Sequence, residues 1–271
     1  MRERVASARM DETDSLLGYE LVGAGGSRVV VLNDWLCDTS TWDHARVYLD
    51  VERFTWAFVD LRGYGRSRGR VGEFGVREAA RDVLALIDSL GWKEVAIIGH
   101  SMSTIVALHL AQAHPARARR VVLITPPPPR GFGMDTPTLE KTQAVVRDDA
   151  ARAEMIRARL ADRYSTGWAA FKTARWIATS DAAAAAAYVA MYARDGLPDP
   201  TTPVPARVLA ITGDEDMPVM RAGAVRESLG ALCPSLEVTT IAGCGHYPMQ
   251  EAPPRTVAVV EEFLGCPPGG A

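Results

Sequence analysis

Short apolar runs alternate along the chain with longer segments of helical periodicity. The apolar runs are rich in Val and Ile, and they lie at residues 28–33, 54–59, 94–99, 120–125, 207–212 and 236–241. Most of them show little polar alternation, which is typical of parallel strands that are covered on both faces. Strands that alternate with helices predict an α/β fold, with a mostly parallel sheet flanked by helices.

The helical segments between these runs have recognisable ends. Residues 76–90 place apolar side chains at helical spacing and are followed by Gly91, a common residue after a helix. Residues 102–114 continue to Pro115, which cannot extend a helix. A last segment with apolar side chains at helical spacing covers residues 254–264. These segments are expected to pack against the faces of the sheet.

The alternation stops between two proline-rich stretches, TPPPPRGFG at 125–133 and DPTTPVPA at 199–206. The stretch between them has no strand pattern, is rich in Ala and Arg, and shows repeated helical periods. We therefore expect residues 128–204 to form a helical insertion, and residues 1–127 and 205–271 to form the α/β core.

The composition and net charge of the chain indicate which kinds of molecule it is expected to bind. The chain has 271 residues, of which 48% are hydrophobic and 23% are charged, and its formal net charge is -3. This ordinary globular composition gives no electrostatic reason to expect a nucleic acid or an anionic membrane as a partner. No apolar run approaches the ~20 residues that span a bilayer, and residues 1–15 lack the apolar stretch of a signal peptide. We expect a cytoplasmic monomer or homodimer that acts on a small-molecule substrate.

The four cysteines are far apart and form no CxxC pair. This spacing indicates neither a metal site nor a disulfide framework. We expect reduced thiols, no metal and no cofactor.

A serine stands where the strand pattern at 94–99 meets the helix pattern at 102–114. The sequence there is Gly-His-Ser-Met-Ser, with Ser101 at its centre. A serine at a helix start is most often an N-cap. It is a nucleophile when a base and an orienting acid lie within reach, so the rest of the chain decides between the two.

Candidate partners for this serine follow two later strands. The stretch TGDEDMP places three acids directly after one strand, Asp214, Glu215 and Asp216, and AGCGHYP places His246 after the next. The carboxyl ends of parallel strands meet at the same edge of a sheet, so these side chains are expected to lie near Ser101.

Four motifs in register with the strand pattern resemble the α/β-hydrolase fold superfamily: GHSMS, DLRGYGRS, TGDED and GCGHYP. The resemblance covers nearly the whole chain, and the order Ser…Asp…His is the one that this family uses. It implies that Ser101 is the nucleophile, His246 the base and Asp216 the orienting acid, and that the insertion is the family's helical cap. Ser103 stands where the family usually has glycine, and because serine is small the turn is expected to survive.

The loop after the first apolar run departs further from the family. Members usually have His-Gly-x there, and the N–H of x forms the oxyanion hole with the N–H that follows the nucleophile. The corresponding residues are Asn33, Asp34 and Trp35, so the implied donors are the N–H groups of Trp35 and Met102. An Asp34 carboxylate in the pocket would oppose an oxyanion, whereas one that faces water would not. Trp35 is alternatively a pocket wall, and His100, which we include among these substrate-binding candidates, is expected to pack beneath the turn.

The sequence thus predicts a serine hydrolase that cleaves a small-to-medium apolar carboxylic ester or lactone through an acyl-enzyme. One alternative is a cofactor-free reaction of another type on the same fold: a ring-cleaving dioxygenase, a C–C hydrolase, a perhydrolase or a lyase. The stretch DWLCD at 34–38 loosely resembles such dioxygenases. The other alternative is a slow-turnover ligand receptor, because plant strigolactone receptors resemble this chain in having serine at the position of Ser103.

Overall fold

A seven-stranded sheet forms the centre of the computed structural model, which describes residues 16–160 and 163–265. The strand order is β1-β3-β2-β4-β5-β6-β7. The strands are β1 (Tyr19–Val22), β2 (Ser27–Leu32), β3 (Phe54–Val59), β4 (Val95–His100), β5 (Ala118–Ile124), β6 (Arg207–Gly213) and β7 (Leu236–Ile241). All neighbouring strands are parallel except β1, which is antiparallel to β3. The predicted α/β fold with a mostly parallel sheet is therefore confirmed.

The burial of the strands follows their composition. Every residue of β3, FTWAFV, is buried, because helices cover both faces of the sheet at this strand. The sequence pattern misses β1, whose four residues, YELV, are all half-buried at the edge of the sheet. A strand this short shows neither an apolar run nor a clear alternation, so only its pairing with β3 defines it.

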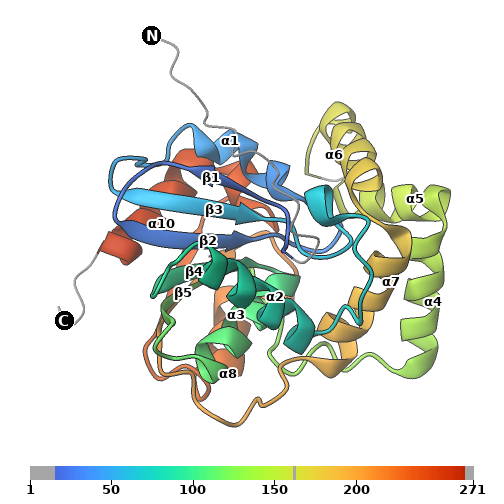
Figure 1. Cartoon of the computed structure of the whole chain (residues 1–271). Helices are drawn as coiled ribbons and strands as arrows, with labels where there is room; N and C mark the ends of the chain where they lie inside the picture. The colour runs from blue at the N-terminus through green and yellow to red at the C-terminus, as the bar shows by residue number, and fades with distance from the viewer. Residues whose placement is uncertain (1–15, 161–162, 266–271) are drawn as a thin grey trace.

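Helices lie on both faces of the sheet. In Figure 1, α2 (Val76–Ser89) and α3 (Met102–Ala113) lie in front of the strands, and α10 (Pro253–Gly265) lies behind them. Two further helices, α1 (Asp43–Arg46) and α8 (Ala222–Leu229), contact α10 and β7 respectively. Across the described ranges, no helix combines the length and apolarity of a membrane span. Residues 1–15 and 266–271, which the sequence analysis assigned to the α/β core, lie outside the described residues.

Four helices lie between β5 and β6, beyond the carboxyl ends of the strands (Figure 1). They are α4 (Thr136–Arg147), α5 (Asp149–Leu160), α6 (Thr166–Thr179) and α7 (Ala182–Ala190), and we call them the insertion. Side-chain N-caps start α4 and α7, where Asp135 accepts from the Thr138 N–H and Asp181 accepts from the Ala184 N–H. Short helical turns occupy Thr39–Trp42 (η1), Gly65–Ser67 (η2), Met191–Asp195 (η3), Pro218–Met220 (η4) and Pro248–Glu251 (α9).

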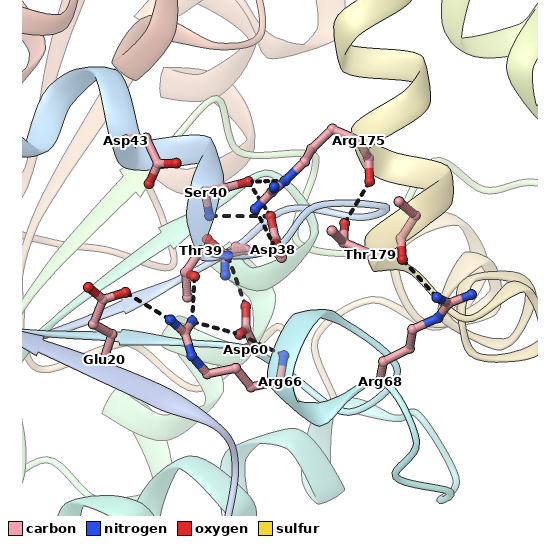
Figure 2. Close-up of polar contacts among 12 residues, drawn as sticks. Glu20, Asp38, Thr39, Ser40, Asp43, Asp60, Arg66, Arg68, Arg175 and Thr179 are labelled. Carbon is pink, nitrogen blue, oxygen red and sulfur yellow. Dashed lines mark hydrogen bonds and ion pairs between the residues drawn. The ribbon is translucent and has the colours of Figure 1, made fainter. Parts of the chain in front are cut away.

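Polar contacts fasten the insertion to the core beside the loop that follows β2. Arg175 on α6 lies 3.2 Å from an Asp38 carboxylate oxygen, and its Nε donates to the Ser40 hydroxyl (Figure 2). Next to them, Arg66 donates to the fully buried carboxylate of Asp60 within the core (Figure 2). We call the contacts of Arg175 with Asp38 and Ser40 the seam, and they hold α6 over the carboxyl edge of the sheet.

The segment DLRGYGRS lets a second helix of the insertion approach the core. Gly63 has a φ of +81°, and a Cβ added there would lie 2.1 Å from the Cβ of Ala184 on α7. The Asp181 N–H also donates to the Gly63 carbonyl at 2.7 Å. Glycine at this position therefore lets α7 lie directly on the turn that follows β3.

Candidate active site

Ser101 occupies a sharp turn between β4 and α3. Its backbone has φ +48° and ψ -113°, a left-handed region that costs a non-glycine residue roughly 1–3 kcal/mol. The strand and helix approach so closely that a Cβ on Gly99 would lie 2.7 Å from the backbone of Ser103 and Thr104. The turn holds Ser101 directly before the first residue of α3, with 8% of its surface exposed.

Ser103, which stands where the family usually has glycine, is part of the turn itself. It is fully buried, and its hydroxyl accepts from the His100 N–H at 2.9 Å and donates to the His100 carbonyl at 3.1 Å. These two bonds tie the first turn of α3 to the last residue of β4. A glycine would leave the His100 N–H without this partner.

His246 and Asp216 meet on neighbouring loops at the same edge of the sheet. The imidazole Nδ1–H donates to Asp216 Oδ2 at 2.9 Å, and Asp216 Oδ1 accepts from the Met217 N–H at 2.7 Å. The other acid of this loop with a clear contact, Asp214, accepts from the Gly243 N–H and so joins the two loops. Asp216 is therefore the acid that orients the His246 ring.

The Asp34 carboxylate binds both N–H groups that the sequence analysis expected to form an oxyanion hole. Its Oδ1 accepts from the N–H of Trp35 at 2.6 Å and from the N–H of Met102 at 3.3 Å. Its Oδ2 lies 3.5 Å from His246 Nε2. Asp34 is 5% exposed, so the alternative in which its carboxylate faces water is wrong. The two N–H groups named from the sequence converge on one point, and a side chain of the same loop occupies it.

This arrangement fixes the charges of the site. Burial opposes the positive charge of His246, but the carboxylates of Asp216 and Asp34 outweigh it and raise the pKa of the imidazole to about 10. Burial likewise opposes the charge of Asp34, but its contact with His246 and the Trp35 N–H lower its pKa to about 2. At neutral pH the site therefore holds an imidazolium between two carboxylates.

Ser101 is adjacent to this cluster but not bonded to it. In the described part of the chain, its hydroxyl makes no hydrogen bond to another side chain, and Nε2 of His246 faces Asp34 instead. Since Met102 follows Ser101 directly, the Asp34 carboxylate bridges the nucleophile turn and His246. In this structure the Nε2 of His246 is therefore directed at Asp34 and not bonded to the Ser101 hydroxyl.

His100 contacts the loop that carries His246, which we call the histidine loop. It is fully buried, and its Nε2–H donates to the His246 carbonyl at 2.7 Å. Burial lowers its pKa to about 4, so the ring is neutral. Its Nδ1 has no hydrogen-bond partner among the described residues.

One group of side chains has the composition of a metal site. Ligand atoms of Asp34, His100 and His246 lie within 4.8 Å of one another. Asp34 and His246 face each other, however, and the Nε2 of His100 is bonded to the His246 carbonyl. Protein contacts alone therefore account for the positions of these rings and of the carboxylate.

Comparison with known proteins identifies the family. Residues 23–259 match the alpha/beta hydrolase family. The chain belongs to this family. A hydrolase from Oleispira antarctica, 17% identical, superposes with a TM-score of 0.81 over 93% of this chain and 96% of that chain, which shows the shared α/β-hydrolase fold.

Two curated relatives match only part of the chain. A pimeloyl-[acyl-carrier protein] methyl ester esterase from Citrobacter koseri is 31% identical over 111 residues, which are 41% of this chain and 41% of that protein. A 2-heptyl-3-hydroxy-4(1H)-quinolone dioxygenase from Mycobacteroides abscessus is 33% identical over 111 residues, 40% of this chain and 41% of that protein. The chain is thus similar to less than half of each, and α/β-hydrolase relatives of this kind differ in their reactions.

Two residues that the sequence analysis did not single out shape this α/β-hydrolase site. Glu251 accepts from the N–H groups of Gly245 and Tyr247, on either side of His246. The sequence could have indicated this role of Glu251, because Glu251 lies in the turn that starts at Pro248. A carboxylate at that position can bond the N-terminal N–H groups of a helix. Lys172 on α6 is 1% exposed, and a charged residue within a helical pattern gives no signal of burial.

Proposed function

We propose that this α/β hydrolase cleaves a small-to-medium apolar carboxylic ester or lactone through a Ser101–His246–Asp216 triad. The observation that carries the proposal is the convergence of the Trp35 and Met102 N–H groups on one oxygen beside His246. That oxygen now belongs to Asp34, but its surroundings are those of an oxyanion: two backbone donors next to a protonated imidazole.

The reaction would start when the substrate carbonyl takes the place of the Asp34 oxygen on the two donors. Once Asp34 has left, His246 releases its Nε2 proton to water, and the neutral imidazole accepts the proton of Ser101 as the hydroxyl attacks the carbonyl carbon. The imidazolium then donates this proton to the leaving alcohol, which leaves an acyl-enzyme on Ser101. Water completes the cycle with His246 again as the base, and Asp216 holds the ring in the required tautomer throughout.

Aromatic side chains packed beside the Asp34 loop support an apolar substrate. Trp35 is buried, packs with its ring tilted by 60° and its centre 5.6 Å from that of Tyr192 in η3, and donates from its indole N–H to the Ala185 carbonyl on α7. Phe132 packs edge-on against Tyr192 at 6.2 Å. The relative from Citrobacter koseri, by its name, acts on a methyl ester, which agrees with this substrate class.

Labelling with a fluorophosphonate probe tests the proposal. The wild-type protein is expected to take up the label on Ser101, because the phosphonyl oxygen can replace the Asp34 oxygen on the two donors. Ser101→Ala should lose both the label and the hydrolysis of p-nitrophenyl esters, by about a thousandfold or more. Ser228→Ala, on α8, serves as the matched serine control. Intact wild-type protein that takes up no label at Ser101 would refute the triad.

A second candidate is a base-initiated reaction that does not use Ser101. The filled oxyanion hole and the partial similarity to the quinolone dioxygenase support it, since such a reaction needs only the His246–Asp216 pair as a base. Oxygen uptake with a hydroxyquinolone that survives Ser101→Ala would favour it over the hydrolase.

A further inference from the structure

A buried lysine of the insertion lies against the histidine loop. Lys172 on α6 is 1% exposed, and its ammonium donates to the Gln250 side-chain carbonyl. The Nζ lies 3.3 Å from the centre of the Tyr247 ring and 4.4 Å from that of Trp176. Tyr247 in turn packs edge-on against His246, with ring centres 5.2 Å apart. The aromatic faces attract the cation, and they also remove it from water.

This ammonium has no full counter-charge in its present position. Across residues 16–160 and 163–265, no carboxylate lies within ion-pair distance of Lys172, and Gln250 is its only hydrogen-bond acceptor. Burial lowers its pKa to about 7, while the carboxylates of Asp34 and Glu251 act in the opposite direction. A buried lysine in this state is costly, and at least one of its donors is free to bind a further oxygen.

Cys37 and Glu251 are not available as partners for the ammonium. Burial raises the pKa of the Cys37 thiol far above neutral, so Cys37 is uncharged. Glu251 is bound by the Gly245 and Tyr247 N–H groups and by Arg163. Asp34 is therefore the carboxylate nearby that has a reason to move.

The proposed reaction removes the Asp34 carboxylate from its present partners. Asp34 has to leave the Trp35 and Met102 donors when a substrate carbonyl arrives, and His246 has to turn to Ser101. A carboxylate that loses its partners inside a buried site is strongly destabilised unless another cation binds it. We propose that Lys172 is a positioning residue, whose ammonium receives the displaced Asp34 carboxylate and so opens the oxyanion hole for substrate.

This inference deepens the proposed function and rests on it. It also gives the insertion a task in the reaction, because Lys172 reaches the histidine loop only while α6 is docked on the core. An α6 that lifts away would leave Asp34 on the oxyanion donors, and the site would stay closed to the substrate carbonyl.

A double-mutant cycle tests this coupling. The four proteins are the wild type, Asp34→Gly, Lys172→Met and the variant that carries both changes. The readouts are the rate of fluorophosphonate labelling of Ser101 and kcat/KM for a p-nitrophenyl ester. Asp34→Gly should be faster than the wild type, because the competing carboxylate is gone. Lys172→Met should be slower by about tenfold, yet the same change should alter the rate of Asp34→Gly by less than about twofold.

Two further variants separate charge from packing. Lys172→Gln removes the charge but keeps a hydrogen-bonding group, and it should behave like Lys172→Met. Lys172→Arg keeps the charge and should retain more of the wild-type rate. A loss of similar size on both backgrounds would show that Lys172 only supports the fold and would overturn the inference. If none of the four proteins is labelled, Asp34→Gly included, the proposed function fails and this inference fails with it.

Discussion

At the scale of single residues, Asp34 combines two contacts within one carboxylate. One oxygen accepts hydrogen bonds from the backbone N–H groups of Trp35 and Met102, and the other faces Nε2 of His246. In a hydrolase these are the places of the oxyanion and of the serine hydroxyl. In the proposed reaction, the Asp34 side chain therefore competes with the substrate at one end and with Ser101 at the other.

The pH dependence of the reaction should reveal this competition. Hydrolysis needs neutral His246, whose pKa is raised to about 10 in the wild type by Asp216 and Asp34, against an ordinary value of 6.5. The labelling rate of Ser101 should therefore rise with pH through the alkaline range, since the base form is scarce below the raised pKa. Asp34→Asn removes one carboxylate, so its inflection should lie at lower pH and its rate at neutral pH should be higher.

The measurement is the second-order rate of fluorophosphonate labelling across the neutral and alkaline range. Asp214→Asn is the matched control, because Asp214 bonds the Gly243 N–H and does not face His246. Identical inflections in the wild type and Asp34→Asn would contradict the assigned role of Asp34.

At the scale of elements, the position of His246 depends on a short turn rather than on a long helix. The turn α9 begins at Pro248, and Glu251 at its end returns to the N–H groups of Gly245 and Tyr247. The Glu251 side chain is only 3% exposed, and Arg163 donates to its carboxylate at 2.8 Å. One side chain thus fixes the backbone on both sides of the catalytic histidine candidate.

Glu251→Gln should loosen this loop. An amide presents one acceptor in place of two carboxylate oxygens, so one of the two N–H groups loses its partner, at a cost of about 1–3 kcal/mol. We expect a lower free energy of unfolding in urea and a lower kcat for ester hydrolysis. Glu262→Gln, on the exposed side of α10, is the control. Unchanged stability and kcat would show that Glu251 does not hold the loop.

At the scale of the whole molecule, the site is assembled from the core and the insertion together. Trp35 is bonded to α7 through the Ala185 carbonyl, Lys172 of α6 lies on Tyr247, and Arg175 of the same helix binds Asp38 (Figure 2). The loop that carries Asp34, Trp35 and Asp38 is therefore held by contacts that the core alone does not supply.

Arg175→Ala should weaken this seam without unfolding the core. Arg175 is 45% exposed and Asp38 is 9% exposed at their side chains, so the change in the free energy of unfolding should be about 1 kcal/mol or less. Amide hydrogen exchange should become faster in α6 and in residues 34–38, and it should stay unchanged in the central strands. Arg194→Ala, which removes an exposed contact with Asp195, is the control. A uniform change across the sheet would contradict a local seam.

The sequence by itself determined the α/β architecture and the family, because apolar runs and turn motifs are local features of the chain. It also placed Ser101, Asp216 and His246 after three of the strands, β4, β6 and β7, whose carboxyl ends share one edge of the parallel sheet. It missed β1, which is defined only by pairing with β3.

The tertiary structure decided what the pattern could not show. Whether the Asp34 carboxylate faces water or the oxyanion donors depends on the surfaces packed around it, and so does the burial of Lys172 in a helix of the insertion. Charge and hydrogen bonding at the site arise from segments far apart in the chain, and their interaction energies exist only once folding has removed the water between them.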